Sequence, residues 1–293
     1  MTKGGSGWIP IRLPTLRGTR FARIDRIRRR VSVKILACVG SYRQRGNTAR
    51  IVALIEEQLQ QTAAGANGSL AFETVYLGHH DIGLCRGCRV CFDKGEAKCP
   101  LHDDLLVIKA KMQAADGLIV ASPVYVDDVS GTTKNWIDRL AHVCHRPEFA
   151  GKCVYLVATT GSSPTGHAIR TLRTATMCWG FYVVGEAGFK TGALMPQEKL
   201  KAQHGPRAKE IAQALFRAIH EKRFVRPTFL SLMTFKIQQR AYQQVDKDSI
   251  DFKYWHSQDW LDPSRTFYGH EEANRAKVGL ARLTGAVVAR LMS

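Results

Sequence analysis

Five short runs of apolar and β-branched residues, each followed by a longer segment with helical periodicity, constrain the fold of this chain more than any other feature. The expected strands are 34–39, 72–77, 117–121, 153–159 and 181–187. The expected helices are 48–61, 103–115, 132–143, 167–179 and 198–221. Strands and helices that alternate in this way form an open sheet with helices on both faces. The sequence therefore predicts an α/β fold with a doubly wound, five-stranded parallel sheet.

Sheets of this kind bind ligands at the carboxyl ends of their strands, beside the point where the strand order reverses. The loop after the first strand, 40–48, reads Gly-Ser-Tyr-Arg-Gln-Arg-Gly-Asn-Thr and ends at a helix. Hydroxyls, an amide, arginines and a helix N-terminus suit a phosphate group. The loop has neither the Gly-x-Gly-x-x-Gly motif nor the Gly-Lys-Ser/Thr motif, which favours a monophosphate. The alternative is a helix-capping turn with solvated arginines.

Four cysteines lie in one short stretch with the spacing Cys-x2-Cys-x2-Cys-x7-Cys, at Cys85, Cys88, Cys91 and Cys99. The compact triplet, and the proline after the last cysteine, are typical of a ferredoxin-like iron–sulfur site, although the final gap is longer. We interpret the stretch as a single [4Fe–4S] site with four thiolate ligands. A structural zinc site, a loop of reduced thiols and two disulfides are the alternatives.

The other four cysteines are scattered among apolar segments, where free cysteine commonly packs as a small hydrophobe. We expect them to lie in the core. They are Cys38, Cys144, Cys153 and Cys178.

Several motifs in this order resemble the iron–sulfur flavoprotein branch of the NADPH-dependent FMN reductase, flavodoxin-like superfamily. They are Gly40-Ser-x-Arg-x-x-Gly-Asn-Thr48, the cysteine run with Asp103-Asp104 behind it, Ala115-Asp-Gly-Leu-Ile-Val-Ala-Ser-Pro-Val-Tyr125, and Ser130-Gly131 with Trp136-Ile-Asp-Arg139. The resemblance covers about residues 33–220. It implies a flavodoxin-like sheet with bound FMN, and the cysteine run points to the branch that carries a cluster.

The resemblance assigns roles by position. The FMN phosphate would be held by Ser41, Arg43, Asn47 and Thr48. The isoalloxazine ring would lie against Pro123, Val124, Tyr125 and Val126 on one side and Thr160, Gly161 and Ser162 on the other. The metal ligands would be Cys85, Cys88, Cys91 and Cys99. No catalytic acid or base is nominated, because electron transfer between FMN and a cluster requires none.

The chain departs from the family pattern at two places. Tyr42 stands where the family commonly has proline, and Asp127 and Asp128 follow the Tyr125 segment. Neither change removes a phosphate ligand. The two carboxylates would repel the phosphate-rich tail of NADPH near the ring, which counts against direct reduction by nicotinamide.

The formal net charge of the 293 residues is +18 and is unevenly distributed. Residues 1–30 hold eight arginines and one lysine against a single aspartate, and they have no steady apolar period. We interpret them as a basic N-terminal tail, with an anionic-surface contact or a targeting segment as alternatives. Residues 31–220 are the expected FMN-binding domain. Residues 221–293 are an aromatic-rich, mostly helical extension that packs on the core or on a partner subunit, or covers a flavin with Tyr254, Trp255 or Trp260.

No stretch approaches the roughly 18 uninterrupted apolar residues that a transmembrane helix needs. The N-terminus also lacks the apolar region of a secretory signal, so we expect a cytoplasmic protein without a membrane span. The basic charge comes with no recognised nucleic-acid-binding module, which disfavours a specific nucleic-acid partner.

The functional hypothesis is an FMN-dependent redox flavoprotein with a [4Fe–4S] cluster, which transfers electrons between a one-electron donor and FMN. Ferredoxin or NAD(P)H is the expected donor, and a homo-oligomer, either dimer or tetramer, is the expected assembly. One alternative is an NAD(P)H-dependent FMN or quinone reductase without a cluster. Another is an electron-carrier or metal-binding module without turnover of its own.

Overall fold

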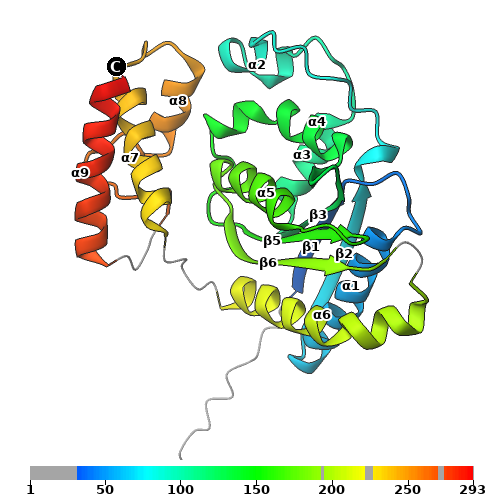
Figure 1. Ribbon diagram of the computed structural model, residues 1–293. Coiled ribbons are helices and arrows are strands. Elements are labelled where there is room, and N and C mark those ends of the chain that lie inside the picture. Colours follow the sequence, from blue (N-terminus) through cyan, green and yellow to red (C-terminus); the bar gives the residue numbers. More distant parts are fainter. Residues whose placement is uncertain (1–31, 193–194, 222–226, 270–273, 293) are drawn as a thin grey trace, which may run out of the picture. The chain divides into compact units, whose positions relative to one another are not determined.

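The computed structural model describes residues 32–192, 195–221, 227–269 and 274–292 (Figure 1). The basic segment 1–30, which we interpret as a tail, lies outside the described residues. The strands and helices below are those of the described part of the chain.

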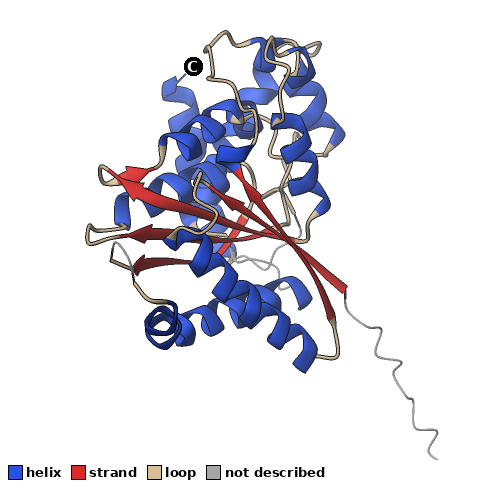
Figure 2. Cartoon of the chain, turned by 90° about the vertical axis from the view of Figure 1, so that its right-hand side faces the viewer, coloured by secondary structure: helices blue, strands red, loops and turns tan. Residues whose placement is uncertain are grey.

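Five parallel strands form the sheet, and each corresponds to a strand expected from the sequence. They are β1 (Ser32–Val39), β2 (Ser69–Tyr76), β3 (Gly117–Tyr125), β5 (Cys153–Thr160) and β6 (Tyr182–Lys190). Their order is β2-β1-β3-β5-β6, which is the flavodoxin order with its switch point between β1 and β3. In register, Ile35 lies opposite Gly117, and Gly117 lies opposite Cys153. Figure 2 shows the twist of this sheet.

A two-residue strand, β4 (Asp128–Val129), pairs antiparallel with the end of β3. The sequence pattern did not predict it. It turns the segment after β3 into a tight hairpin at the carboxyl edge of the sheet.

The helices that accompany the sheet are α1 (Asn47–Gly65), α3 (Leu105–Ala114), α4 (Gly131–Arg139), α5 (Gly166–Cys178) and α6 (Gln197–His220). One expectation needs correction. The expected helix over 132–143 is two elements, because α4 ends at Arg139 and a 3₁₀ turn, η3 (Ala141–Cys144), follows Leu140.

The helices cover both faces of the sheet, with α1 and α6 on one face and α3, α4 and α5 on the other (Figure 1). The period-two pattern of β1 explains this arrangement. Val33, Ile35, Ala37 and Val39 pack with α1 and α6, whereas Leu36 and Cys38 pack on the opposite face. Both faces of the central strands are therefore buried, as in other doubly wound sheets.

The chain between β2 and α3 is irregular apart from three short turns, η1 (Leu77–His79), α2 (Val90–Asp93) and η2 (Glu96–Lys98). We call residues 82–103 the cysteine loop. Gly87 and Gly95 adopt φ values of 63° and 92°, and Arg89 a φ of 64°, so the loop turns sharply three times within nine residues.

The C-terminal extension contains α7 (Phe229–Gln244), α8 (Ile250–Ser257) and α9 (Arg275–Met292). Phe235, Tyr242, Trp255 and Trp260 form its buried aromatic cluster. Trp255 Nε1 donates to the His145 carbonyl at 2.7 Å, and Gln238 Nε2 donates to the Cys144 carbonyl at 2.8 Å. The extension therefore packs against the segment after η3. Trp255 and Trp260 are buried inside this cluster.

Within the described ranges, none of the helices combines the length and the apolar character that crossing a membrane requires.

Candidate functional site

The loop that follows β1 is joined by hydrogen bonds to β3 and to the segment after it at the carboxyl edge of the sheet. Gly40 N donates to the Ala121 carbonyl at 2.8 Å. The Ser130 hydroxyl donates to the Gly40 carbonyl at 2.6 Å. A Cβ atom on Gly40 would stand 1.7 Å from Thr133 Oγ1, so this close approach requires glycine. The segments singled out from the sequence thus lie next to one another.

The loop after β1 presents cations and backbone amides to solvent. Arg43 and Arg45 are exposed. Ser41 is buried, and its hydroxyl accepts from the Arg43 amide at 3.0 Å. Gly46 stands at the N-cap of α1, so no side chain of that residue covers the first amides of the helix. This arrangement suits an anion such as a phosphate.

Two of the predicted phosphate ligands are engaged elsewhere in the fold. Thr48 Oγ1 and Thr159 Oγ1 share a hydrogen bond of 2.6 Å, which joins α1 to β5. Asn47 Nδ2 donates to the Gly192 carbonyl at 2.8 Å. These two side chains connect the loop after β1 to the loops after β5 and β6. Ser41 and Arg43, by contrast, hydrogen-bond to each other within the loop.

The hairpin between β3 and β4 contains two consecutive residues in the left-handed region. Val126 has a φ of 49° and Asp127 a φ of 64°. This conformation is costly for a β-branched residue such as valine. Val126 is fully exposed and Tyr125 is 55% exposed, whereas Pro123 is buried and Val124 half-buried. The hairpin therefore offers an apolar, solvent-facing surface next to the loop after β1.

The loop after β5 supplies the third wall. Thr160 is buried, and its carbonyl accepts from Thr191 N at 2.9 Å. Gly161 and Ser162 follow it and are exposed. Of the three predicted residues, Gly161 and Ser162 are thus accessible to a ligand, and Thr160 fixes their position.

All four cysteines of the cysteine loop line one cavity of about 460 Å³. Cys85 and Cys88 are exposed, whereas Cys91 and Cys99 are half-buried. Burial raises the pKa of the Cys91 thiol, and the charges of Cys99, Cys85 and Cys88 raise it further. Four thiolates around one cavity repel one another unless a cation binds between them. The donor set is therefore suited to an all-thiolate metal group.

The end of α4 and the turn after it line one side of this cavity. Asn135 Nδ2 donates to the carbonyls of Ile82 and Gly83 at 3.0 and 3.2 Å, and its Oδ1 accepts from Cys85 N at 3.2 Å. Arg139 follows four residues later and also donates to the Gly83 carbonyl, at 2.8 Å. Asn135 was not predicted from the sequence. Its spacing of four from Arg139 places both on one helix face, which is the signal that was available.

Arg139 and Asp103 form a buried ion pair at the end of the cysteine loop. Arg139 Nη1 lies 2.5 Å from Asp103 Oδ2, and the two side chains are 3% and 5% exposed. Asp103 also accepts from the amides of Gly83 and Leu105. Burial acts to raise the pKa of Asp103, but the Arg139 guanidinium and the two amides outweigh it and hold this pKa below its ordinary value. The carboxylate therefore stays ionised and ties both ends of the loop to α4.

A second charged group lies behind the loop. Lys109, which is buried, donates to Glu96 at 2.6 Å and to Glu148 at 2.8 Å. Arg146 donates to the Cys91 carbonyl at 2.7 Å and also pairs with Asp251 of α8. None of these contacts was evident from the sequence, because the partners lie 13 to 105 residues apart.

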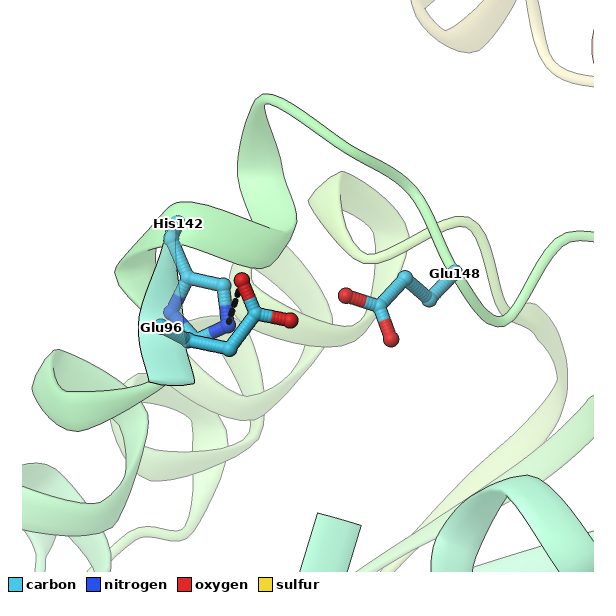
Figure 3. A group of neighbouring side chains, drawn as sticks. All are labelled: Glu96, His142 and Glu148. Atoms are coloured by element: carbon cyan, nitrogen blue, oxygen red, sulfur yellow. Dashed lines mark ion pairs between the residues drawn. The ribbon is translucent and has the colours of Figure 1, made fainter. Parts of the chain in front are cut away.

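Glu96, His142 and Glu148 lie together in this group, with ligand atoms within 4.8 Å of one another (Figure 3). The Lys109 ammonium already lies between the two carboxylates, where a metal ion would have to bind. Burial lowers the pKa of His142 to about 4, so the imidazole is neutral near pH 7. The two carboxylates are therefore paired with Lys109 beside a neutral imidazole, and we assign no metal to the three side chains.

The other four cysteines lie apart from the cavity. Cys38 and Cys153 are buried, and burial raises the pKa of their thiols to about 12 and about 11. Cys144 and Cys178 are half-buried and hydrogen-bond to each other. The expected packing in the core therefore holds for Cys38 and Cys153, whereas Cys144 and Cys178 are only partly buried.

A family model described as NADPH-dependent FMN reductase matches residues 33–193, which is more than half of the chain. The chain belongs to this family. It is therefore a redox flavoprotein of the FMN type and an oxidoreductase, and the matched segment contains all three loops and the cysteine loop.

This member of the NADPH-dependent FMN reductase family is similar to several curated proteins named iron–sulfur flavoprotein. One from Archaeoglobus fulgidus is 29% identical over 194 residues, which are 63% of this chain and 83% of that protein. One from Methanocaldococcus jannaschii is 38% identical over 107 residues, which are 36% of this chain and 51% of that protein. The chain thus matches only about half the length of the second relative. These names support the iron–sulfur flavoprotein branch of the family.

Among solved structures, this family member resembles the crystal structure of RosB with a bound 8-demethyl-8-formylriboflavin-5'-phosphate intermediate. The two are 14% identical, with a TM-score of 0.51, and the match covers 82% of this chain and 91% of RosB. At this identity the likeness shows the fold alone.

Proposed function

We propose that this flavoprotein carries FMN and a [4Fe–4S] cluster and transfers electrons between a one-electron donor and the flavin. FMN exchanges electrons singly or in pairs, whereas a cluster passes one at a time, so together they connect one-electron and two-electron partners. The protein's own residues bind the two groups, orient them and set the charge around them.

The observation that carries the proposal is the cavity lined by Cys85, Cys88, Cys91 and Cys99. Four thiols reach it from a single loop, and Asn135 and Arg139 hold that loop against α4. The names of the curated relatives also favour a cluster. Structural zinc remains the rival ligand for the same thiols.

For FMN, the proposed ligands lie on the three loops at the carboxyl edge. We propose that Ser41, Arg43 and the α1 amides contact the phosphate directly, while Asn47 and Thr48 hold the loop in shape. The proposed isoalloxazine contacts are Pro123, Val124, Tyr125 and Val126, with Thr160, Gly161 and Ser162 on the other side. No catalytic acid or base is proposed.

Anaerobic purification followed by iron, sulfide and flavin analysis tests the proposal. We expect about four irons, about four sulfides and one FMN per chain, with a broad visible absorbance that dithionite bleaches. Stoichiometric zinc without labile sulfide would replace the cluster by a structural site. Full FMN occupancy without iron or zinc would favour the second candidate, an NAD(P)H-dependent FMN or quinone reductase. The name of the family supports this candidate.

Single substitutions locate the cluster. Cys85→Ala, Cys88→Ala, Cys91→Ala or Cys99→Ala should each abolish or destabilise the iron–sulfur group, because one iron loses its protein ligand, while FMN content should persist. Cys38→Ala is the matched control, since this thiol is buried within β1 and is not among the residues that line the cavity. Unchanged iron content in the four loop variants, or its loss in Cys38→Ala alone, would contradict the assignment.

Ferredoxin is the donor that we favour over NAD(P)H. Arg86 and Arg89 are exposed beside Cys85 and Cys88, which suits an acidic one-electron carrier. Asp127 is also exposed at the hairpin that borders the proposed ring site, where it would repel a nicotinamide dinucleotide. Steady-state reduction of FMN with ferredoxin, NADH and NADPH compares the donors directly. Faster turnover with NADPH than with ferredoxin would reverse this choice.

We also propose a cytoplasmic homo-oligomer, in which 31–220 bind FMN, 221–293 form an extension and 1–30 act as a basic tail. Exposed apolar residues spaced three and four apart on α9 support the oligomer: Leu280, Leu283, Val287 and Leu291 are 58%, 66%, 50% and 82% exposed. Such a stripe is complementary to a second copy of itself. Leu283→Glu should lower the mass in analytical ultracentrifugation, and a monomeric parent protein would contradict the assembly.

A further inference from the structure

We propose that Arg139 sets the reduction potential of the iron–sulfur group held by the cysteine loop, through its positive charge and an N–H···S hydrogen bond to Cys99. The inference rests on the proposed function, because it requires a cluster in the four-cysteine cavity. Arg139 is a positioning residue here, since it acts on the group through its ligand Cys99.

The guanidinium of Arg139 is divided between three partners. Nη1 donates to the Gly83 carbonyl and to Asp103 Oδ2, and Nη2 donates to Asp103 Oδ1 at 3.2 Å. Nη2 also donates to Cys99 Sγ, at 3.9 Å. The fork geometry of arginine allows one side chain to hold the carboxylate and reach the sulfur together.

Because Arg139 is buried, its charge acts strongly on the neighbouring sulfur of Cys99. The Arg139 side chain is 3% exposed, so bulk water and salt screen its charge weakly. The charge is permanent, because arginine keeps its proton at all ordinary pH values. Asp103 offsets part of it. However, the Asp103 oxygens also accept hydrogen bonds from the amides of Gly83 and Leu105. The guanidinium, and not the carboxylate, hydrogen-bonds to the sulfur of Cys99.

The other buried cations near the loop do not serve the same purpose. Lys109 is held by Glu96 and Glu148. Arg146 is held by Glu96 and Asp251. These two cations face three carboxylates, so the group as a whole carries no excess positive charge. Among the described residues, Arg139 is the cation that hydrogen-bonds to a cysteine sulfur of the loop, whereas Arg146 donates to the backbone carbonyl of Cys91.

Reduction adds a negative charge to an iron–sulfur group. Hydrogen bonds to its sulfurs and nearby positive charge stabilise the reduced form more than the oxidised form, and so raise the reduction potential. Removal of the Arg139 charge should therefore make the cluster harder to reduce. The flavin, whose proposed ligands lie on other loops, should keep its own potential.

The experiment compares two variants in the FMN-loaded, anaerobically purified protein. Arg139→Gln keeps N–H donors without the charge, and Arg139→Lys keeps the charge without the fork. Iron, sulfide and FMN contents are measured first, and the cluster and FMN potentials are then titrated by visible and electron paramagnetic resonance spectroscopy. For Arg139→Gln we expect the equilibrium constant for one-electron reduction of the cluster to fall tenfold, which is about 59 mV. Arg139→Lys should recover part of the shift.

Lys201→Gln is the matched control, because Lys201 lies on α6, which covers the other face of the sheet, and pairs with Glu57 at the exposed surface. It should leave the cluster potential unchanged. An Arg139→Gln protein with full iron and the parent potential would overturn the inference, as would an equal shift in Lys201→Gln.

A second measurement does not depend on the folding of any variant. The parent protein labelled with ¹⁵N-arginine should show a weak ¹⁵N coupling to the reduced cluster in pulsed electron paramagnetic resonance, and absence of this coupling would overturn the inference. Arg139 variants that retain FMN but bind no iron would assign the residue to cluster assembly and also overturn it. If the parent protein itself contains neither iron nor sulfide, the proposed function fails, and this outcome is distinct from a failure of the inference about Arg139.

Discussion

The loop after β1 and the cysteine loop are both held in place by buried polar side chains, but the chemistry of the two is opposite. Neutral hydroxyls hold the first, through Ser130 and Thr133 around Gly40 and through the Thr48–Thr159 bond. Charged side chains hold the second, through Arg139 with Asp103 and Lys109 with Glu96.

This difference matters for the groups that the two loops would bind. Hydroxyl contacts do not titrate near neutral pH, so the shape of the loop after β1 should be independent of pH. Buried ion pairs are costly to break when one partner is removed, since the other charge is left unpaired. The cysteine loop should therefore be the more sensitive region, both to single substitutions and to acid.

The largest effect is expected from Asp103→Ala, which leaves the buried Arg139 guanidinium without its carboxylate. We expect a loss of about 3–5 kcal/mol in the free energy of unfolding, measured by urea denaturation. Asp138→Ala is the control, because Asp138 pairs with Lys134 at the exposed surface. That pair should contribute less than about 0.5 kcal/mol. Equal losses in the two variants would show that burial of the ion pair is unimportant.

The next effect is the acid sensitivity that Glu96 confers. Burial acts to raise the pKa of Glu96, but the Lys109 ammonium and a backbone amide outweigh it and lower this pKa from 4.5 to about 2. Because the folded-state pKa is lowered, the stabilisation is complete above about pH 4.5 and is lost as the pH falls toward 2. Glu96→Gln should lower the free energy of unfolding at pH 7 by about 2 kcal/mol.

Urea denaturation at a series of pH values between 7 and 2 checks this prediction. The Glu96→Gln protein should lose less stability over the acid range than the parent. Parallel pH profiles for the two proteins would contradict the assignment of the acid sensitivity to Glu96.

A third prediction tests the loop after β1 as a phosphate site. Arg43→Ala should weaken FMN binding by about 1.5–3 kcal/mol, because it removes a charge-assisted hydrogen bond. Fluorescence titration of the apoprotein with FMN measures the change in Kd, which should be at least tenfold. Arg45→Ala is the matched control for general attraction between cations and phosphate, and it should have the smaller effect. An unchanged Kd in Arg43→Ala would move the phosphate to another loop.

The smallest effect is expected from Thr48→Val, which removes the hydroxyl bond between α1 and β5. A neutral hydrogen bond of this kind contributes about 1 kcal/mol. The loss in the free energy of unfolding should be the same at pH 5 and pH 8, since neither hydroxyl titrates in that range. A loss that grows at pH 5 would show that the two loops are held by similar chemistry after all.

Much of the fold could be predicted from the sequence, because strands buried on both faces and amphipathic helices leave strong periodic patterns. Each of the five parallel strands lies within a few residues of its expected position, and the cysteine spacing placed four thiols on one loop. The break between α4 and η3 was missed, since residues 132–143 keep an apolar pattern across it. The hairpin strand β4 was missed because two residues carry no period.

The amino-acid sequence by itself determined the sheet, its connections and the set of thiols, because these depend on patterns between neighbours along the chain. Only the tertiary structure decided which side chains surround the thiols. Lys109 comes from α3, Asn135 and Arg139 come from α4, and Arg146 follows η3, and only the packing of these segments against the sheet brings them there. Tertiary structure also decided that Asn47 and Thr48 bond to other loops, since a hydroxyl or an amide in a sequence does not reveal its partner.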